Sequence, residues 1–445
     1  MISLGCPKNL VDSEKMMAQL AEGGCVVGAP MAEADVVVVN TCGFLAAARE
    51  ESLAVIREAL VHKQANPTAR VVVAGCLVSR DGEQLFEAVP GIDAIVGVND
   101  RERLLKAVLG SRRVSHVTAY KETRSAGKMP ASRISSDAGR FRLTPRHTAY
   151  VRISEGCSQR CTFCTIPSIR GPFRSKAPAD VLAEARELLD DGAVELNVIG
   201  QDTTSYGMDF LTNADGANEV DLAALMSSLA DLDGARWIRL LYAYPTRFSP
   251  RLIDVMAERE NIVKYVDMPL QHMSDGVLRR MGRRVTRAKI ETLLRRLREA
   301  GLAIRTTFIV GFPGESEAEF SELLSFVQEF KFDALGVFEF SPEEGTPAVR
   351  LRGPVDAELK ADRARRVMLA QRKIALAANR RRRGQRLDVL VDGVDSAGRC
   401  IARHAGQAPD IDGVCLLSPP RPAGTIVRAK VTGSDGYDLR VTTDC

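Results

Sequence analysis

Three cysteines in one short loop constrain the fold of this 445-residue chain more than any other feature. Cys157, Cys161 and Cys164 follow residues 148–154, whose alternating pattern predicts a strand, and a turn at residues 155–156. The three thiols are therefore expected on a loop at the carboxyl end of a strand. Active sites of parallel α/β folds are built at that edge, so the loop predicts an α/β protein with its chemistry at the strand ends.

A metal cluster explains the spacing of these thiols better than the alternatives do. A structural zinc site takes four ligands, and the nearest histidine, His147, lies upstream of the strand. A disulfide framework does not suit a long chain without a secretory signal. An electron-transfer 4Fe-4S cluster takes four cysteines, so three would leave one iron open for a substrate. Three buried hydrophobic residues, the remaining interpretation, would not require so tight a spacing.

The Cys-x-x-x-Cys-x-x-Cys motif after a first strand resembles the radical S-adenosylmethionine (SAM) superfamily. In that superfamily the open iron chelates the amino and carboxylate groups of SAM, and reductive cleavage yields a 5′-deoxyadenosyl radical. The resemblance implies a 4Fe-4S cluster on Cys157, Cys161 and Cys164, with SAM and a reducing electron donor as partners.

The composition is that of an ordinary globular protein, with 45% hydrophobic and 27% charged residues. No secretory signal and no apolar run of membrane-spanning length is recognised, so we expect a cytoplasmic protein without a membrane partner. Ten cysteines in such a compartment indicate metal or redox chemistry. A net charge of +4 from 61 basic and 57 acidic residues is not the signature of a nucleic-acid binder as a whole.

Residues 1–110 predict a parallel-sheet domain with a second set of converging thiols. Strand and helix patterns alternate there, and the apolar runs are rich in valine, as in strands covered on both faces. Cys6, Cys42 and Cys76 each follow a predicted strand. Parallel strands point the same way, so the three thiols are expected at one edge of the sheet, although three coincidentally placed buried cysteines remain an alternative.

Motifs around these cysteines resemble the N-terminal domain of the methylthiotransferases: Ser-Leu-Gly-Cys-Pro-Lys-Asn-Leu-Val-Asp-Ser-Glu at residues 3–14, Asn-Thr-Cys-Gly-Phe at 40–44 and Ala-Gly-Cys-Leu at 74–77. In that family the three cysteines ligate an auxiliary 4Fe-4S cluster that supplies the sulfur. The resemblance thus implies two 4Fe-4S clusters. Only residues 2–4 precede Gly5, which predicts a short edge strand or an N-terminus upstream of Met1.

Residues 111–142 are polar with little periodicity and are interpreted as a linker.

Residues 143–382 contain six strand patterns separated by amphipathic helices, which predicts a partial (β/α)6 barrel. The five strands after the first are expected at residues 195–200, 237–242, 263–268, 304–311 and 334–340.

Polar residues follow several of these strands and predict a cavity floor, although each one singly is more often a helix cap or a solvated side chain. They are Gln201, Asp202, Gln271, His272, Glu315, Glu343 and Glu344. By family resemblance, Gly200, Gln201 and Asp202 meet the amino group of SAM, and Gly311 and Gly314 lie beside its adenosyl part. Phe163, inside the cysteine motif, is assigned to the same cofactor. His272 is interpreted as a structural histidine.

The C-terminal part combines a basic helix pattern with a predicted small β-barrel. Residues 358–383 carry ten Lys or Arg against two acids, which is a solvated helix face by default and an RNA contact as the alternative. Residues 383–445 resemble the TRAM domain, an oligonucleotide-binding-like module. From residue 384 onward, eight Asp against seven Lys and Arg, with Tyr437 as the one aromatic, fit a basic protein partner better than RNA.

Two branches of the methylthiotransferase family compete. One modifies an adenosine of tRNA (MiaB-like), and the other modifies an aspartate of ribosomal protein uS12 (RimO-type). Cys6-Pro-Lys8-Asn9 resembles the protein-modifying branch, whereas the tRNA branch typically shows Cys-Gln-Met-Asn. Motifs at residues 154–157, 166–171 and 340–346 favour the same branch. A non-enzymatic iron–sulfur RNA-binding protein is the third hypothesis.

The RimO-type resemblance implies that the adenosyl radical removes hydrogen from the β-carbon of the aspartate. That C–H bond is inert to acid–base chemistry, which is why a radical cofactor is required. A methylated sulfur at the auxiliary cluster then couples to the carbon, and a second SAM supplies the methyl group. The substrate is uS12, free or on the assembling small subunit.

Cys25, Cys400, Cys415 and Cys445 show no ligand spacing. We expect that replacing any one of them by Ala leaves the iron content of the reconstituted protein unchanged, because none is needed to hold a cluster. Iron analysis after anaerobic reconstitution checks this, and loss of iron from one variant would show that the ligand assignment is wrong.

Overall fold

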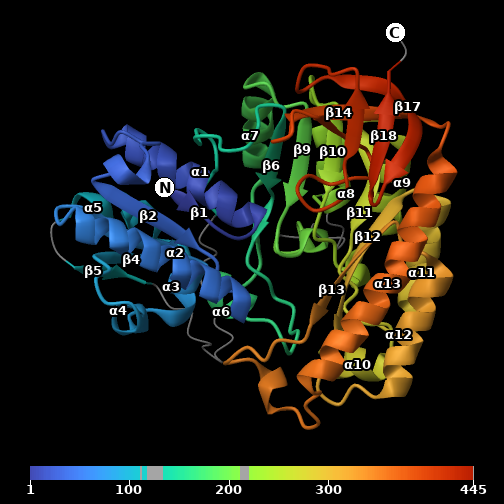
Figure 1. The fold of residues 1–445 in the computed structure, drawn as a ribbon, viewed down its shortest axis with the longest axis horizontal. Coiled ribbons are helices and arrows are strands. Elements are labelled where there is room, and N and C mark those ends of the chain that lie inside the picture. The colour runs from blue at the N-terminus through green and yellow to red at the C-terminus, as the bar shows by residue number, and fades with distance from the viewer. Residues whose placement is uncertain (111–112, 118–133, 211–219, 444–445) are drawn as a thin grey trace.

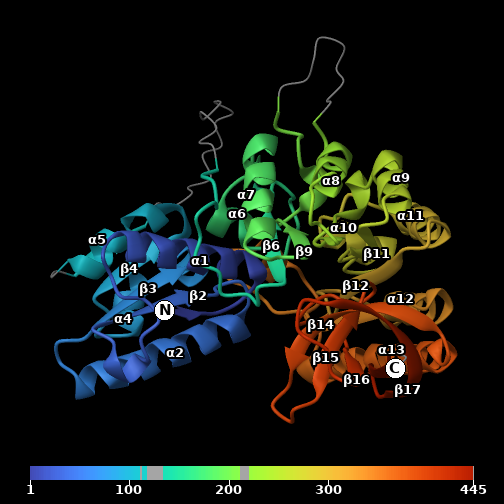
Figure 2. The same cartoon turned by 90° about the horizontal axis from the view of Figure 1, so that it is seen from above.

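The computed structural model describes residues 1–110, 113–117, 134–210 and 220–443. They form an N-terminal sheet domain, a central domain built on a second parallel sheet, and a C-terminal barrel (Figures 1 and 2). Cys445 and residues 111–112 and 118–133 of the expected linker lie outside the described residues.

The N-terminal domain has one parallel sheet in the order β1-β2-β3-β4-β5. Its strands are β1 (Ile2–Ser3), β2 (Val36–Thr41), β3 (Arg70–Gly75), β4 (Ala94–Gly97) and β5 (Val114–His116). α1 (Pro7–Glu22) and α5 (Leu104–Leu109) cover one face, and α2 (Ala46–Ala65), α3 (Cys76–Asp81) and α4 (Gln84–Ala88) cover the other. The valine runs are buried between these layers, as expected.

Part of the expected linker belongs to folded structure. β5 pairs in parallel with β4 as the fifth strand, although its three residues carry too little periodicity to announce a strand. Further along, Asp137 and Arg140 are buried and make ion pairs with Arg152 and Glu14. These pairs join residues distant in sequence, so local patterns do not reveal them.

The central sheet has the parallel order β13-β12-β11-β10-β9-β6, which is a six-stranded partial barrel as predicted. The strands are β6 (Thr148–Arg152), β9 (Glu195–Ile199), β10 (Trp237–Leu240), β11 (Ile262–Asp267), β12 (Ala303–Val310) and β13 (Ala334–Glu339). The helices are α7 (Pro178–Asp190), α8 (Leu222–Ala230), α9 (Pro250–Glu258), α10 (Asp275–Arg280), α11 (Arg287–Glu299) and α12 (Glu317–Phe330).

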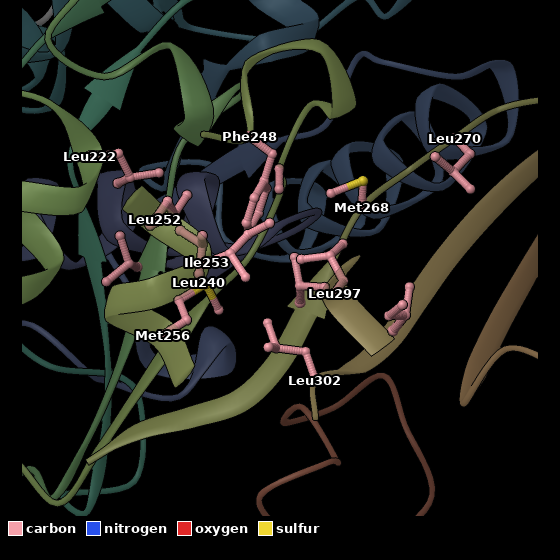
Figure 3. Packing of buried hydrophobic residues seen from close by; sticks show 14 of the residues in the cluster. Leu222, Leu240, Phe248, Leu252, Ile253, Met256, Met268, Leu270, Leu297 and Leu302 are labelled. Atoms are coloured by element: carbon pink, nitrogen blue, oxygen red, sulfur yellow. The ribbon is translucent and has the colours of Figure 1, made fainter. Parts of the chain in front are cut away.

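The two faces of this sheet pack against different partners. Ile238 and Leu240 point to the helices and join the main hydrophobic core, where Leu252, Met256 and Leu297 meet them (Figure 3). The alternate positions point to the inner face. There Trp237 and Tyr265 contact apolar residues of α1 and of the C-terminal barrel.

The C-terminal barrel is closed, in the order β14-β15-β16-β18-β17, which confirms the expected small β-barrel. Its strands are β14 (Arg386–Val394), β15 (Cys400–His404), β16 (Cys415–Ser418), β17 (Ile426–Asp435) and β18 (Asp438–Thr442). The long helix α13 (Ala357–Arg382) packs on α12 and β13 and leads into the barrel (Figure 1).

A buried ion cluster holds the barrel on the inner face of the central sheet. Glu195, the first residue of β9, accepts hydrogen bonds from Arg239 at 3.1 Å and from Arg403 of the barrel at 2.8 Å. Burial raises the pKa of this carboxyl, but the charges of Arg403 and Arg239 outweigh it and lower the pKa from 4.5 to about 2. Glu195 therefore stays ionised and ties the two domains together.

Glu195→Gln is expected to destabilise the protein by about 3–5 kcal/mol, because it leaves the buried guanidinium of Arg239 without a countercharge and removes one of the two carboxylates that pair with Arg403. The pKa is lowered on folding, so the stabilisation is present above about pH 4.5 and is lost as the pH falls towards 2. Thermal unfolding midpoints of wild type and variant should therefore converge on acidification.

Asp388→Asn is the matched control, because the Asp388–Arg428 pair is exposed and such pairs contribute about 0–1 kcal/mol. Equal effects of the two substitutions would show that Glu195 does not hold the barrel in place.

Candidate active site

The first cysteine triad consists of Cys6, Cys42 and Cys76, which lie at the strand ends of the N-terminal sheet. Close contacts hold these strand ends together. Gly5, between β1 and Cys6, has a φ of +88°, and a Cβ there would stand 2.8 Å from the Cβ of Cys42. Asn9 Nδ2 donates to the carbonyl of Leu4 at 2.6 Å and to that of Thr41 at 3.3 Å. Glycine and asparagine thus bring the loops of the first two cysteines together, as the strand-end prediction required.

The three thiols of this first triad lie in different electrostatic surroundings. Burial raises the pKa of Cys6, but Lys8, Arg170 and backbone N–H groups at the start of α1 bring the pKa below its usual value. Burial raises the pKa of Cys42, and it raises that of Cys76 to about 12. Cys6 is therefore the thiol that most readily ionises.

The second triad consists of Cys157, Cys161 and Cys164. It occupies a loop that is fixed by backbone hydrogen bonds to other parts of the central domain. The loop follows β7 (Ser154–Glu155), which pairs with β8 (Arg174–Ser175), and precedes the short helix α6 (Ile166–Arg170). Cys157 N donates to Gly171 O at 3.1 Å, and Thr162 N donates to Met281 O at 2.9 Å. Burial raises the pKa of Cys157 to about 12 and also raises that of Cys164.

A chain of buried charges connects the two triads. Arg170 Nη2 lies 3.3 Å from Cys76 Sγ and 2.9 Å from Asp12 on α1, and Arg170 Nη1 lies 3.1 Å from Glu155. Glu155 stands two residues before Cys157 and also pairs with Arg152. Burial raises the pKa of Glu155, but Arg170 and Arg152 outweigh it and hold the pKa far below its usual value. The thiol-bearing edges of both domains therefore meet across an ionised network.

The predicted SAM-contact residues of the second strand join this network. Gln201 Nε2 donates to Glu155 at 2.8 Å, and its buried Oε1 has no hydrogen-bond partner among the described residues. Asp202 accepts from Gln159, inside the cysteine loop, at 2.8 Å. Gly200 is packed so closely that a Cβ would lie 2.4 Å from Ser154 Oγ.

The other assigned SAM-contact residues, Phe163, Gly311 and Gly314, make packing contacts within the central domain. Phe163 packs edge-on against Phe312, with ring centroids 6.3 Å apart. A Cβ on Gly311 would lie 2.0 Å from Cγ of Lys360, and Gly314 N donates to Gly353 O at 2.6 Å. These contacts give the glycines a packing reason, and their contact with SAM stays a prediction.

Three polar residues of the expected cavity floor have structural partners. His272 is buried, and its Nδ1 accepts from Ser274 N at 2.9 Å, in line with its structural interpretation. Glu315 lies 3.7 Å from Arg363 on α13. Glu343 accepts from Arg80 of α3 at 2.9 Å, so it binds the N-terminal domain to the central one.

Four further residues of the site lie within the family motifs, but the sequence alone predicted no role for them. Asp12, Glu155 and Arg170 form the network between the triads, and Lys8 lies beside Cys6 with Nζ 3.3 Å from Gly200 O. Each lies in a segment that carried the family resemblance. The resemblance was the available signal, because contacts such as Arg170–Asp12 and Lys8–Gly200 connect residues more than a hundred positions apart.

Each triad offers three cysteines, a donor set that suits an iron–sulfur cluster with one iron left open. No group of three His, Cys, Asp or Glu among the described residues is arranged to hold one metal ion. Ligands of a single zinc ion stand about 2.3 Å from it, whereas the cysteines of a four-iron cluster bind different irons and stand further apart. Cys400 and Cys415 are buried in the barrel core instead, and Cys25 packs at the edge of the N-terminal core.

One cavity of the described structure lies away from both triads. It measures about 430 Å³, is lined by the first residues of β12 and β13 with α13 and the barrel, and includes Arg305, Gly336 and His404. It therefore opens near the amino ends of strands, whereas active sites of this architecture form at the carboxyl ends.

Comparison with known families matches all three domains. Residues 1–97 match the uncharacterized protein family UPF0004, residues 151–327 match the radical SAM superfamily and residues 384–443 match the TRAM domain.

Curated relatives match the whole chain. The ribosomal protein uS12 methylthiotransferase RimO of Desulforamulus reducens is 41% identical over 445 residues, which cover 99% of this chain and 98% of that protein. The chain belongs to the RimO family. RimO of Geotalea uraniireducens is 41% identical and RimO of Solibacter usitatus 43%, covering 99% and 98% of this chain and 96% and 93% of those proteins.

Solved structures support the fold of this RimO family member. The radical SAM methyltransferase TsrM of Kitasatospora setae has a TM-score of 0.52 at 16% identity, over 78% of this chain and 71% of that one. This likeness shows the fold alone. Within the described residues, none of the helices has the length and apolar character needed to cross a membrane.

Cys161→Ala is expected to abolish formation of 5′-deoxyadenosine from SAM and to lower the iron content by about half, because a cluster on the second triad loses one of three protein ligands. The N-terminal triad keeps its own contacts and should retain its iron. Product analysis and iron assay check both statements.

Cys400→Ala is the control for loss of a buried thiol without loss of a ligand. Unchanged SAM cleavage in Cys161→Ala would contradict the assignment of the second triad.

Proposed function

We propose that the protein is a radical SAM methylthiotransferase that adds a methylthio group to the β-carbon of an aspartate in ribosomal protein uS12. One observation carries the proposal: two cysteine triads, one in each of two domains, meet across the Arg170–Glu155 pair. A protein that needs a single cluster for electron transfer would have no use for two cysteine triads. The names of the full-length relatives support the substrate.

In this proposal Cys157, Cys161 and Cys164 hold the cluster that binds SAM, and Cys6, Cys42 and Cys76 hold a second 4Fe-4S cluster. When bound, these groups supply the electron that opens SAM and the sulfur that is transferred. Phe163, Gly200, Gln201, Asp202, Gly311 and Gly314 are the proposed SAM contacts. The unpartnered Oε1 of Gln201 supports this, because a buried acceptor without a donor indicates a missing ligand.

The protein contributes charge compensation and water exclusion. Burial raises the pKa of Cys76 and Cys157 to about 12, so these thiols would stay protonated at neutral pH without a metal. A bound metal deprotonates its thiol ligands, and Arg170 beside Cys76 stabilises the resulting negative charge. Reconstitution should therefore release protons.

The exposed charges of the C-terminal barrel differ from its total charge count. Among the described residues of the barrel, six of the seven Lys and Arg are exposed, three Asp are exposed and four further Asp, such as Asp392 beside Arg403, are partly exposed. The charge of the barrel surface therefore does not by itself choose between a basic protein partner and RNA. The choice of uS12 is supported by the motifs and the relatives.

We also propose that RNA touches the end of α13. Arg380, Arg381 and Arg383 are exposed there and precede β14, and clustered basic side chains bind phosphates through charge neutralisation. Such a contact fits a uS12 substrate on the assembling small subunit. The proposed setting is the cytoplasm, with a reducing electron donor.

The decisive experiment is anaerobic turnover of the reconstituted protein with SAM and dithionite on uS12, small-subunit particles and unmodified tRNA in parallel, read by mass spectrometry. We expect a methylthio-for-hydrogen gain on an aspartate of uS12. The same gain on adenosine would establish the tRNA alternative. SAM binding without 5′-deoxyadenosine would favour the non-enzymatic hypothesis.

A further inference from the structure

Buried cations in this protein almost always face a carboxylate. Nine Lys and Arg side chains among the described residues are buried. Seven of them form ion pairs with Asp or Glu: Arg140, Arg152, Arg170, Lys176, Arg239, Arg363 and Arg403. Lys8 and Arg283 are the two for which the described part of the chain provides no ion pair. An uncompensated buried charge is costly, so these two positions call for a partner of opposite charge.

Each of these two cations lies beside one cysteine triad. Arg283 Nη1 is 3.9 Å from Cys161 Sγ, on the side of the second triad. Lys8 is two residues from Cys6, and its Nζ lies 3.3 Å from the carbonyl of Gly200 at the end of β9. Lys8 therefore reaches from the first triad to the loop that carries the SAM-contact residues.

The surroundings of Lys8 hold its ammonium without neutralising it. The ring centroid of Tyr242 lies 3.2 Å from Nζ, and Tyr242 has an uncommon φ of +59°. Residues in such strained backbone conformations cluster at functional sites. Of the three donors on the ammonium, one has the Gly200 carbonyl and one faces the ring, which leaves one donor for a further acceptor.

The acids that face Lys8 are committed to other cations. Glu155 binds Arg152 and Arg170, and Asp267 accepts from Arg305 at 2.8 Å. Neither reaches Nζ within ion-pair distance. Lys8 also lies in the first turn of α1, where the helix dipole disfavours a cation and favours an anion. A bound anion would thus gain from Lys8 and from the helix at once.

We propose that Lys8 binds the carboxylate of the substrate's acidic side chain and so holds the adjacent carbon in the gap between the two triads. This inference rests on the proposed function and names the residue that reads the substrate's acid. An aspartate carries its carboxylate one bond from the reacting carbon, so fixing the carboxylate fixes the carbon. Arg283 lies beside Cys161 of the second triad, and we assign it no contact with the substrate's carboxylate.

Lys8→Met keeps the length and apolar character of the stem and removes the charge, whereas Lys8→Arg keeps the charge. Binding of reconstituted enzyme to uS12 and to its Asp→Asn form is measured anaerobically without reductant. Wild type should favour the aspartate form by about 10- to 100-fold, as expected for loss of a hydrogen bond between charged groups. Lys8→Met should bind both forms alike, and Lys8→Arg should retain part of the preference.

With SAM and dithionite, Lys8→Met should still form 5′-deoxyadenosine but should transfer little methylthio group to uS12. Lys15→Met is the matched control, because Lys15 lies on the same helix and contacts the carbonyl of Ala138. It should behave as wild type in both assays.

Three results would overturn the inference. Lys8→Met could keep the wild-type preference for aspartate, could lose iron that Lys8→Arg retains, or could lose affinity for SAM with the preference intact. The first result would show that Lys8 has no role in substrate binding. The second would show that it balances the charge of a cluster, and the third that it acts in SAM binding. A wild-type enzyme that leaves uS12 unmodified would instead refute the proposed function.

Discussion

The buried network of Asp12, Arg152, Arg170 and Glu155 is the interaction on which the arrangement of the site depends. It joins α1 of the N-terminal domain to β6, β7 and α6 of the central one. Removing one member of a buried ion cluster leaves the others uncompensated, which costs several kcal/mol. Asp12 is the member that crosses between the domains, because it pairs with both Arg152 and Arg170 and so fixes their relative position. That position brings the thiol-bearing ends of two parallel sheets together.

The same principle acts at the opposite end of the central sheet. Glu195, Arg239 and Arg403 fasten the barrel to the inner face, where Trp237 and Tyr265 also meet it. α1 and the barrel thus divide this face between them, one near each end of the strands. The barrel closes the end away from the triads, which leaves the carboxyl ends of the strands for chemistry.

Charge is distributed unevenly between these two contacts and the triads. Cations within the domain contacts are matched by carboxylates, whereas Lys8 and Arg283 face thiols and a carbonyl. This difference separates groups that stabilise the fold from groups available to a ligand.

The sequence by itself determined the α/β class, the six central strands, the small barrel and both cysteine triads. These follow from hydrophobic periodicity and from thiols placed directly after strands, and periodicity reports local structure. Only the tertiary structure decided that β5 belongs to the first sheet, that Arg170 and Glu155 connect the triads, and that Lys8 lies at their junction. Those contacts join residues separated by up to about two hundred positions, and no local pattern records which distant side chain will neutralise a buried charge.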